Sequence, residues 1–296
     1  MREINRRLFM KQLGLLTAGA GAVSLLSSCY DDRLDPLTIP EKPFKIIELN
    51  LRARRLEQNR FFWETLMGFT VVDAPSASQY TLRIGQENDE KQTLLTFRQS
   101  TLPPNLEDSF FPQYHFTISI PSNQIESCLE WVLQQKAINP ATNEEVTIPL
   151  WKDYITNAEI IRRNLYNSQS VFIQDPAGNV VELLARHVMN NTADGPFNNN
   201  MFIGISEVGI VTRDVRKSAA LLKETFGVEE VVGSSNSFKP MGGATGLLKL
   251  IVPGKPWIPT DNELAVDHEM VLTIRHTEQL DPILLPKSGV LLKTIV

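Results

Sequence analysis

Three side chains that can ligate a metal recur at an even interval along the chain. Glu48, His115 and Glu182 are separated by 67 residues in each step. Two carboxylates and one imidazole form a ligand set suited to Zn, Mn, Fe, Ni or Co. The same residues could instead form a hydrogen-bonded polar cluster in a solvated pocket. In that case the two carboxylates would raise each other's pKa, and His115 would favour its charged form.

The local pattern around each of the three is that of a strand with one polar and one apolar face. Polar residues alternate with aliphatic and aromatic ones, so that Glu48, His115 and Glu182 each lie opposite apolar neighbours. If helices cover the apolar faces, the polar faces line a hollow that the three strands share. The other polar residues expected to line this hollow are Asn50, Arg52, Thr96, Thr117 and Ser119.

The elements that carry these residues repeat along the chain. Segments 46–69, 114–135 and 205–228 each begin as a strand of alternating character, pass through a short polar link and end as an amphipathic helix. Further strand-like runs follow each helix. This internal repeat predicts an α+β fold with mixed sheets, and it argues against a doubly wound parallel sheet.

Two segments carry a more specific pattern. From Glu48 to Phe69 the chain has a potential ligand, a Leu-x-Leu pair, a helix with adjacent aromatics and a Gly-Phe exit. The sequence Asp175-Pro-Ala-Gly-Asn precedes Glu182 and also suits a tight turn between strands. Both segments resemble the vicinal-oxygen-chelate superfamily, which includes glyoxalase, bleomycin-resistance and extradiol dioxygenase proteins. The resemblance covers about 44–188, and about 203–275 as a third module with the start of a fourth.

The resemblance implies a fold and a chemistry. The fold is a glyoxalase-like mixed-sheet half-barrel of repeated βαβββ modules, with a third, partly completed module. The resemblance also implies that Glu48, His115 and Glu182 hold a divalent metal, which chelates neighbouring substrate oxygens and acts as a Lewis acid. The implied enzyme would be a metal-dependent lyase, isomerase or dioxygenase.

Two departures from the superfamily pattern bear on that chemistry. The first ligand is Glu48 where His is commoner, and the fourth, commonly Glu, falls at Thr96, a poor ligand. A three-ligand site with open positions is chemically sensible. So is a degenerate site in a non-catalytic ligand-binding or scaffold protein. The third module has Glu207 and Glu269 at corresponding places but no closing motif, so no second complete metal site is expected.

The N-terminus has the layout of a secretory signal. Arg6-Arg7 precede an apolar run of 14 residues that ends at Leu26, and Leu-Ser-Ser-Cys ends at Cys29. The run is shorter than the roughly 20 residues that span a bilayer. The arginine pair resembles a twin-arginine export signal and the second motif resembles the bacterial lipobox. They imply an exported protein, anchored through lipid on Cys29 to the cell envelope at its periplasmic face or cell surface. The alternative is an uncleaved amphipathic helix.

These patterns divide the chain into five parts. They are a signal peptide at 1–29, a proline-containing tether at 30–43, a two-module vicinal-oxygen-chelate domain at 44–188, a linker at 189–202, and an incomplete second domain at 203–296 that holds the third module.

Composition limits the partners. The 296 residues are 42% hydrophobic and 21% charged, as is ordinary for a globular protein. The net charge of −5, with scattered basic residues, disfavours nucleic-acid binding. The expected partners are a small-molecule ligand, a membrane reached through Cys29, and a second copy of the chain or an envelope protein. Cys128 falls at an apolar position of a predicted helix, where we expect a buried, inert thiol.

Overall fold

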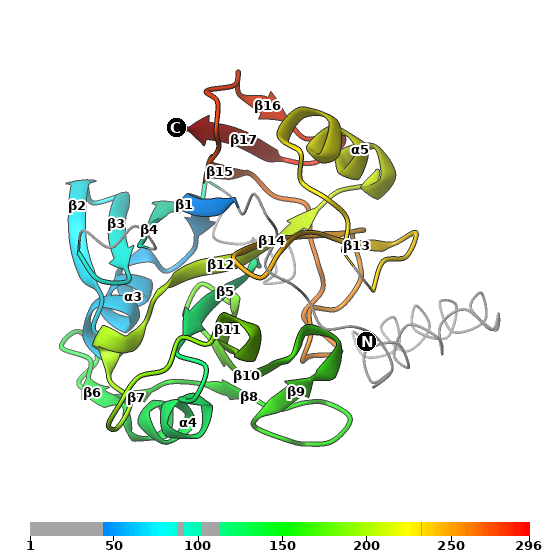
Figure 1. Ribbon diagram of the computed structural model, residues 1–296. Helices are drawn as coiled ribbons and strands as arrows, with labels where there is room; N and C mark the ends of the chain where they lie inside the picture. Colours follow the sequence, from blue (N-terminus) through cyan, green and yellow to red (C-terminus); the bar gives the residue numbers. More distant parts are fainter. Residues whose placement is uncertain (1–43, 88–91, 102–112, 232) are drawn as a thin grey trace, which may run out of the picture.

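The computed structural model describes residues 44–87, 92–101, 113–231 and 233–296. The expected signal peptide, its Cys29 and the tether lie outside the described residues. Within the described ranges, no helix is long and apolar enough to cross a membrane. Two large sheets, with α3, α4 and α5 packed on them, make up this part of the chain (Figure 1).

The chain forms four modules in sequence order, of which the first two are complete. In both, the first strand lies parallel to the last, and the remaining strands follow antiparallel. The first module consists of β1 (Lys45–Ala53), α3 (Leu56–Phe61) with a π-helical turn (Phe62–Leu66), β2 (Thr70–Ser76), β3 (Gln79–Ile84) and β4 (Thr93–Gln99). The second consists of β5 (His115–Ile120), α4 (Ile125–Gln134), β8 (Leu150–Trp151), β10 (Ser168–Gln174) and β11 (Val180–Arg186).

The second module also carries an insertion between α4 and β10. It contains β6 (Lys136–Ile138) paired with β7 (Glu145–Thr147), and β9 (Ile161–Arg163) paired with β10. The 3-10 helices Asn164–Tyr166, His187–Met189 and Asn199–Met201 lie in this insertion and in the link to the third module. That link, expected as a plain linker, buries Phe197 and Phe202 in the core.

The last two modules are shortened. The third consists of β12 (Gly204–Val211), α5 (Val215–Phe226), β13 (Phe238–Gly243) and β14 (Gly246–Ile251). The fourth consists of β15 (Met270–Arg275), β16 (Ile283–Leu284) and β17 (Val290–Ile295), and the described residues between β15 and β16 form no helix. The predicted α+β fold of repeated βαβββ modules with a partly completed third is thus confirmed, and the structure adds a fourth module that lacks its helix.

Pairing of first strands joins the modules two by two. β1 lies antiparallel to β15, so modules one and four form sheet A, in the order β16-β17-β15-β1-β4-β3-β2. β5 lies antiparallel to β12, so modules two and three form sheet B, in the order β13-β14-β12-β5-β11-β10-β8. The expectation that modules one and two curl around a shared hollow is therefore wrong. The first strand of a module pairs with the last strand of that module on one edge and leaves its other edge free. Here the free edges of β1 and β5 pair with β15 and β12, which belong to the second half of the chain.

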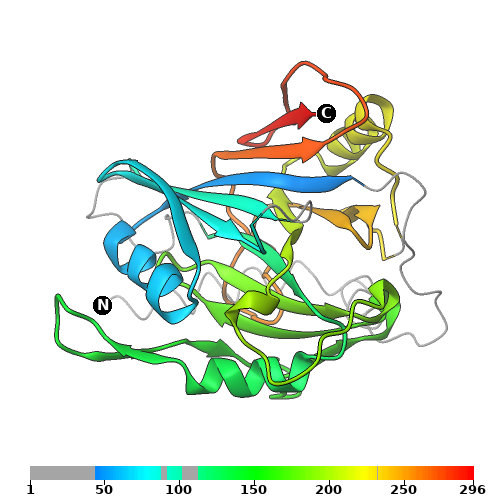
Figure 2. The same cartoon turned by 60° about the vertical axis from the view of Figure 1, so that its left-hand side comes forward.

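The apolar faces of the two sheets pack against each other, as the two layers in Figure 2 show. Trp63 lies between them, with its ring centroid 6.1 Å from that of Phe97 in sheet A and 6.0 Å from that of Phe116 in sheet B. Cys128 on α4 is buried in the same core, and burial raises the pKa of its thiol, as expected of an inert cysteine. The polar residues of β1 and β5 consequently lie on the outer faces of their sheets.

Asp175 ties the second module to the first. Its carboxylate accepts hydrogen bonds from Trp63 Nε1 at 3.2 Å, and from the backbone N and side-chain Nδ2 of Asn179 at 2.9 and 2.8 Å. Burial raises the pKa of Asp175 to about 6, against these hydrogen bonds. The Asp-Pro-Ala-Gly-Asn segment forms the expected tight turn, and the same carboxylate holds the indole at the centre of the core.

We predict that Asp175 makes stability fall as pH rises from about 4 to 6. Its folded-state pKa of about 6 lies above the ordinary 3.8, so the folded state binds the proton more tightly. Its contribution is therefore fully present below the ordinary pKa and lost as pH passes the folded-state pKa. A shift of two units corresponds to about 3 kcal/mol. Denaturant unfolding at several pH values measures it. An unchanged slope in Asp175→Asn would show that another group is responsible.

Candidate functional site

The structure does not bring the three expected ligands together. Glu48 lies on β1 in sheet A, where its carboxylate accepts hydrogen bonds from Asn50 Nδ2 at 2.9 Å and Thr273 Oγ1 at 3.3 Å. His115 on β5 and Glu182 on β11 lie in sheet B, with His115 Nε2 3.5 Å from Glu182 Oε2. The expected ligand set is thereby corrected, because β1 pairs with module four and not with module two.

In place of that set, sheet B holds five side chains that we call the sheet B cluster. They are His115, Glu182, Arg186, Glu207 and Lys249, all buried or nearly so. Lys249 Nζ lies 3.1 Å from His115 Nε2 and 3.0 Å from Glu182 Oε2, and it forms an ion pair with Glu207 Oε2. Arg186 forms an ion pair with the other oxygen of Glu207. Two carboxylates thus face one ammonium and one guanidinium, and the formal charges balance.

Hydroxyl groups donate the remaining hydrogen bonds to the Glu182 carboxylate. Thr117 Oγ1 donates to Oε2 at 2.9 Å, and Ser170 Oγ donates to Oε1 at 2.6 Å. Arg186 Nη1 also donates to the backbone oxygen of Ala244 at 2.6 Å. Buried polar groups are stable when their hydrogen-bonding capacity is used in this way. Both oxygens of Glu182 are therefore hydrogen-bonded, whereas the buried Nε of Arg186 has no hydrogen-bond partner among the described residues.

The lysine sets the protonation states of its neighbours. Burial by itself would raise the pKa of Glu182, but the Lys249 ammonium, and then His115, outweigh it and hold that pKa well below its usual range. Burial and Lys249 together lower the pKa of His115, so the ring favours its neutral form. Both directions are opposite to those expected for a cluster without an internal cation. Burial also lowers the pKa of Arg186 to about 10, which leaves it charged.

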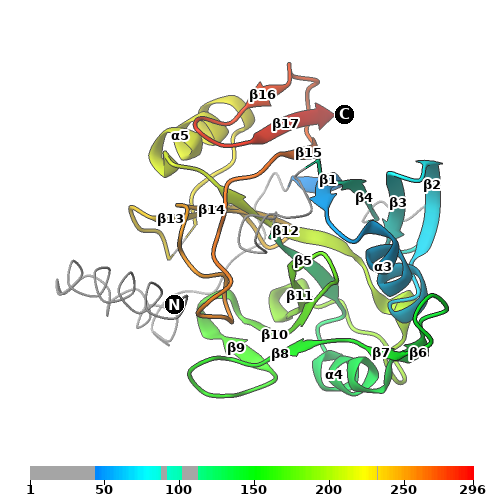
Figure 3. The same cartoon turned by 180° about the vertical axis from the view of Figure 1, so that it is seen from behind.

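A loop between β14 and β15 closes the cluster from outside. Trp257, from this loop, stacks on His115 with ring centroids 5.3 Å apart and planes inclined by 26°. Phe172 lies 6.3 Å away with its plane inclined by 20° to the imidazole. Gly209 makes room for the indole, because a Cβ there would lie 2.4 Å from Trp257. Figure 3 shows the loop, in orange, running down beside sheet B before the chain returns to β15.

The donor set of sheet B does not fit the divalent metal that the resemblance implies. A metal held by His115, Glu182 and Glu207 would have to share its place with the ammonium of Lys249, which contacts all three. As the side chains stand in the part of the chain that the structure describes, with Lys249 among them, no group of three or more His, Cys, Asp or Glu residues is placed to hold a metal ion. The cluster therefore gives no basis for a metal-dependent step.

Sequence reasoning missed Arg186, Glu207 and Lys249 as members of this cluster. The sequence pattern placed Glu207 in module three at the position that Glu48 holds in module one. It did not show that module three pairs with module two. Lys249 gave no signal, because a lysine in an apolar strand pattern resembles any solvated residue. Its burial follows from the pairing of β14 with β12 beside β5.

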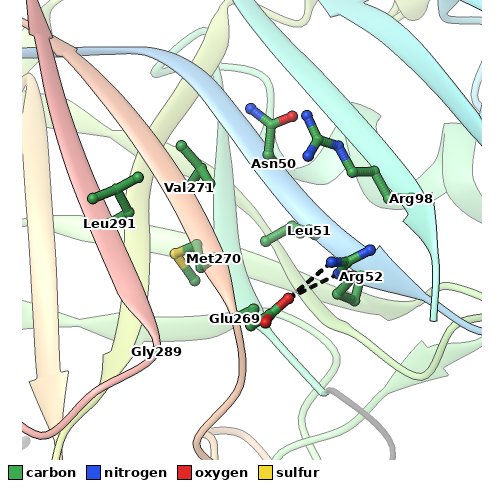
Figure 4. Close-up of a pocket in the computed structure, with 9 residues that line it drawn as sticks. All are labelled: Asn50, Leu51, Arg52, Arg98, Glu269, Met270, Val271, Gly289 and Leu291. Carbon is green, nitrogen blue, oxygen red and sulfur yellow. Dashed lines mark hydrogen bonds and ion pairs between the residues drawn. The ribbon is translucent and has the colours of Figure 1, made fainter. Parts of the chain in front are cut away.

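The outer face of sheet A is open and holds a pocket of about 220 Å³, which we call the sheet A pocket. Its lining includes Asn50, Arg52, Arg98, Glu269, Val271 and Leu291 (Figure 4). Arg52 donates to Glu269 Oε2 from Nε at 3.1 Å and from Nη2 at 2.9 Å. Arg98 is exposed on β4, and its guanidinium has no hydrogen bond or ion pair among the described residues. The pocket thus presents one paired and one available guanidinium beside the amide of Asn50.

The expected pocket-lining residues are divided between the two sheets. Asn50 and Arg52 line the sheet A pocket. Thr96 is buried and shares a hydrogen bond of 2.9 Å with Thr81, while Thr117 belongs to the surroundings of Glu182. Ser119 shares a hydrogen bond of 2.7 Å with Ser206 on β12. Of the five, only Asn50 and Arg52 line the sheet A pocket.

Comparison with known proteins gives structural neighbours only. No family model and no curated protein match the chain. A putative dioxygenase from Bacillus subtilis is 17% identical, with a TM-score of 0.48, over 79% of this chain and 71% of its own. Glyoxalase I from Zea mays is 13% identical, with a TM-score of 0.43, over 85% of this chain and 92% of its own.

A fosfomycin resistance protein from Listeria monocytogenes, whose structure contains Mn(II), is 10% identical with a TM-score of 0.30. The match covers 47% of this chain and 87% of the fosfomycin resistance protein. All three are likenesses to solved structures alone. With identities below 20% and TM-scores below 0.5, they carry no argument about the chemistry of this chain.

We predict that Arg186→Ala destabilises the fold by about 3–5 kcal/mol, because it removes one partner of a buried ion pair and leaves Glu207 with an excess of negative charge. Arg52→Ala is the matched control. It breaks the exposed pair with Glu269, which we expect to lower the free energy of unfolding by less than about 1 kcal/mol. Urea unfolding of both variants provides the comparison. Equal losses would mean that the sheet B cluster contributes no more than a surface pair.

Proposed function

We propose that this chain is an exported, lipid-anchored protein with a glyoxalase-like fold that binds a small molecule in the sheet A pocket. The supporting observation is the pocket itself, in which the guanidinium of Arg98 has no partner among the described residues. The alternative, a metal-dependent lyase, isomerase or dioxygenase, is disfavoured by the position of Lys249 within the donor set of sheet B.

The lining points to a ligand with a carboxylate and a short apolar part. A guanidinium presents two parallel N–H groups that match the two oxygens of a carboxylate. The side chains of Val271 and Leu291 offer an apolar wall for the remainder of the ligand. The volume of about 220 Å³ lies below the roughly 300–1,000 Å³ of sites for drug-sized ligands. We therefore expect a compact organic acid.

We predict saturable binding of small carboxylates and its loss in Arg98→Ala. Calorimetric titration with acetate, hexanoate, benzoate and succinate, each compared with its neutral amide, provides the measurement. A hydrogen bond to a charged group contributes about 1.5–3 kcal/mol, so Arg98→Ala should weaken the best carboxylate about tenfold or more.

The matched control is Arg60→Ala, which removes another exposed arginine, on α3 and outside the lining of the pocket. This variant should bind as the wild type does. If no carboxylate binds the wild type, or if each amide binds as well as its acid, an anion-binding pocket at sheet A is excluded.

We further predict that Cys29 carries the lipid. In a bacterial host with lipoprotein export, the full chain should incorporate labelled palmitate and sediment with membranes, because several acyl chains give stable anchoring. Cys29→Ser should lose both properties. Cys128→Ser, which alters the only other cysteine, should keep them. Label that persists in Cys29→Ser, or a wild type without label, would contradict the lipoprotein assignment.

A further inference from the structure

The two halves of the sheet B cluster occupy equivalent positions in modules two and three. In module two, Glu182 on the last strand pairs with Thr117, two residues beyond His115 on the first strand. In module three, Lys249 on the last strand pairs with Gly209, two residues beyond Glu207 on the first strand. His115 therefore corresponds to Glu207, and Glu182 corresponds to Lys249.

The antiparallel contact between β5 and β12 brings these two pairs to one point. Glu207 pairs with Thr117 across that contact, so the first strands of the two modules are related by an approximate two-fold axis. Because alternate residues of a strand share a face, all four side chains lie on the same side of sheet B. Three of the four are common metal ligands, and the fourth is a lysine.

From this arrangement we infer that the ammonium of Lys249 is a tethered cation that takes the place of a metal ion in sheet B. Its Nζ contacts His115, Glu182 and Glu207 at once. The side chain is 14% exposed, and those of Glu182 and Glu207 are 4% and 3% exposed, so the charges meet away from bulk water. A dication added to the same donors would lie within a few ångströms of the ammonium and be repelled by it.

Sheet A provides the internal comparison. The positions equivalent to the four in sheet B are Glu48, Thr96, Val271 and Lys293, by the same register rule. Only one of these is a carboxylate, and Lys293 is exposed on β17. A lysine therefore stands at the last-strand position of both shortened modules, but only Lys249 faces donors that need a positive charge.

The inference leads to a conversion experiment that is independent of the sheet A pocket. Lys249→His replaces the ammonium with a neutral ligand and leaves His115, Glu182 and Glu207 in place. We expect it to bind one equivalent of Co²⁺ or Zn²⁺, at least a hundred-fold more tightly than the chelator-treated wild type. Visible absorption of Co²⁺ reports nitrogen and oxygen coordination, and calorimetry with Zn²⁺ reports stoichiometry. Lys293→His, at the equivalent position of sheet A, is the matched control and should gain no site.

A second variant covers the case in which Lys249→His does not fold without metal. Lys249→Ala should have a lower melting temperature than the wild type, because two buried carboxylates lose their shared cation. Zn²⁺ should restore its stability during refolding, and the further substitution His115→Ala should abolish that rescue.

Three results would overturn the inference. The first is a wild type that binds one equivalent of metal tightly and loses it when His115 is removed. The second is a Lys249→His variant that folds but binds Co²⁺ or Zn²⁺ no better than Lys293→His does. The third is a failure of both Lys249 variants to refold when Zn²⁺ is present.

Discussion

The antiparallel pairing of first strands is the constraint on which the rest of the structure depends. β1 takes β15 as its neighbour and β5 takes β12, and each contact decides which side chains share a sheet face. The same pairing separates Glu48 from His115 by placing them on opposite outer faces of a two-layer molecule. A one-residue slip of β1 would only turn Glu48 into the apolar core between the sheets, so it could not bring Glu48 to the face that holds His115.

The two outer faces then have different properties because different modules complete them. Module three contributes Glu207 and Lys249 to sheet B, and the loop that follows it places Trp257 over His115. The balanced ion pairs and the indole stacked on His115 together cover that face. Module four contributes no helix and only Glu269 as a charged group to the pocket of sheet A. That face keeps an open concavity with arginines at its rim, and it is the place where a small molecule has access.

Buried ion networks of this kind are weak evidence for stability by themselves, because desolvation opposes the attraction. In sheet B the network instead affects which chemistry the site can carry out. An ammonium attached to β14 cannot be exchanged and offers no open coordination position to a substrate; burial lowers the pKa of Lys249, and the Glu182 carboxylate opposes that shift. We infer that in sheet B the ammonium of Lys249 supplies the positive charge that the resemblance assigns to a metal ion.

The sequence by itself determined the elements and their grouping. Alternation around Glu48, His115 and Glu182 identified the strands, the repeat identified three of the four modules, and the Asp175 turn brought Glu182 onto the strand beside His115. Only the tertiary structure decided which modules pair. The first strand of each module leaves one edge free, so periodicity could not distinguish module two from module four as the neighbour of β1. The membership of Lys249 in a buried cluster followed from that choice, because it depends on a contact between strands more than 130 residues apart.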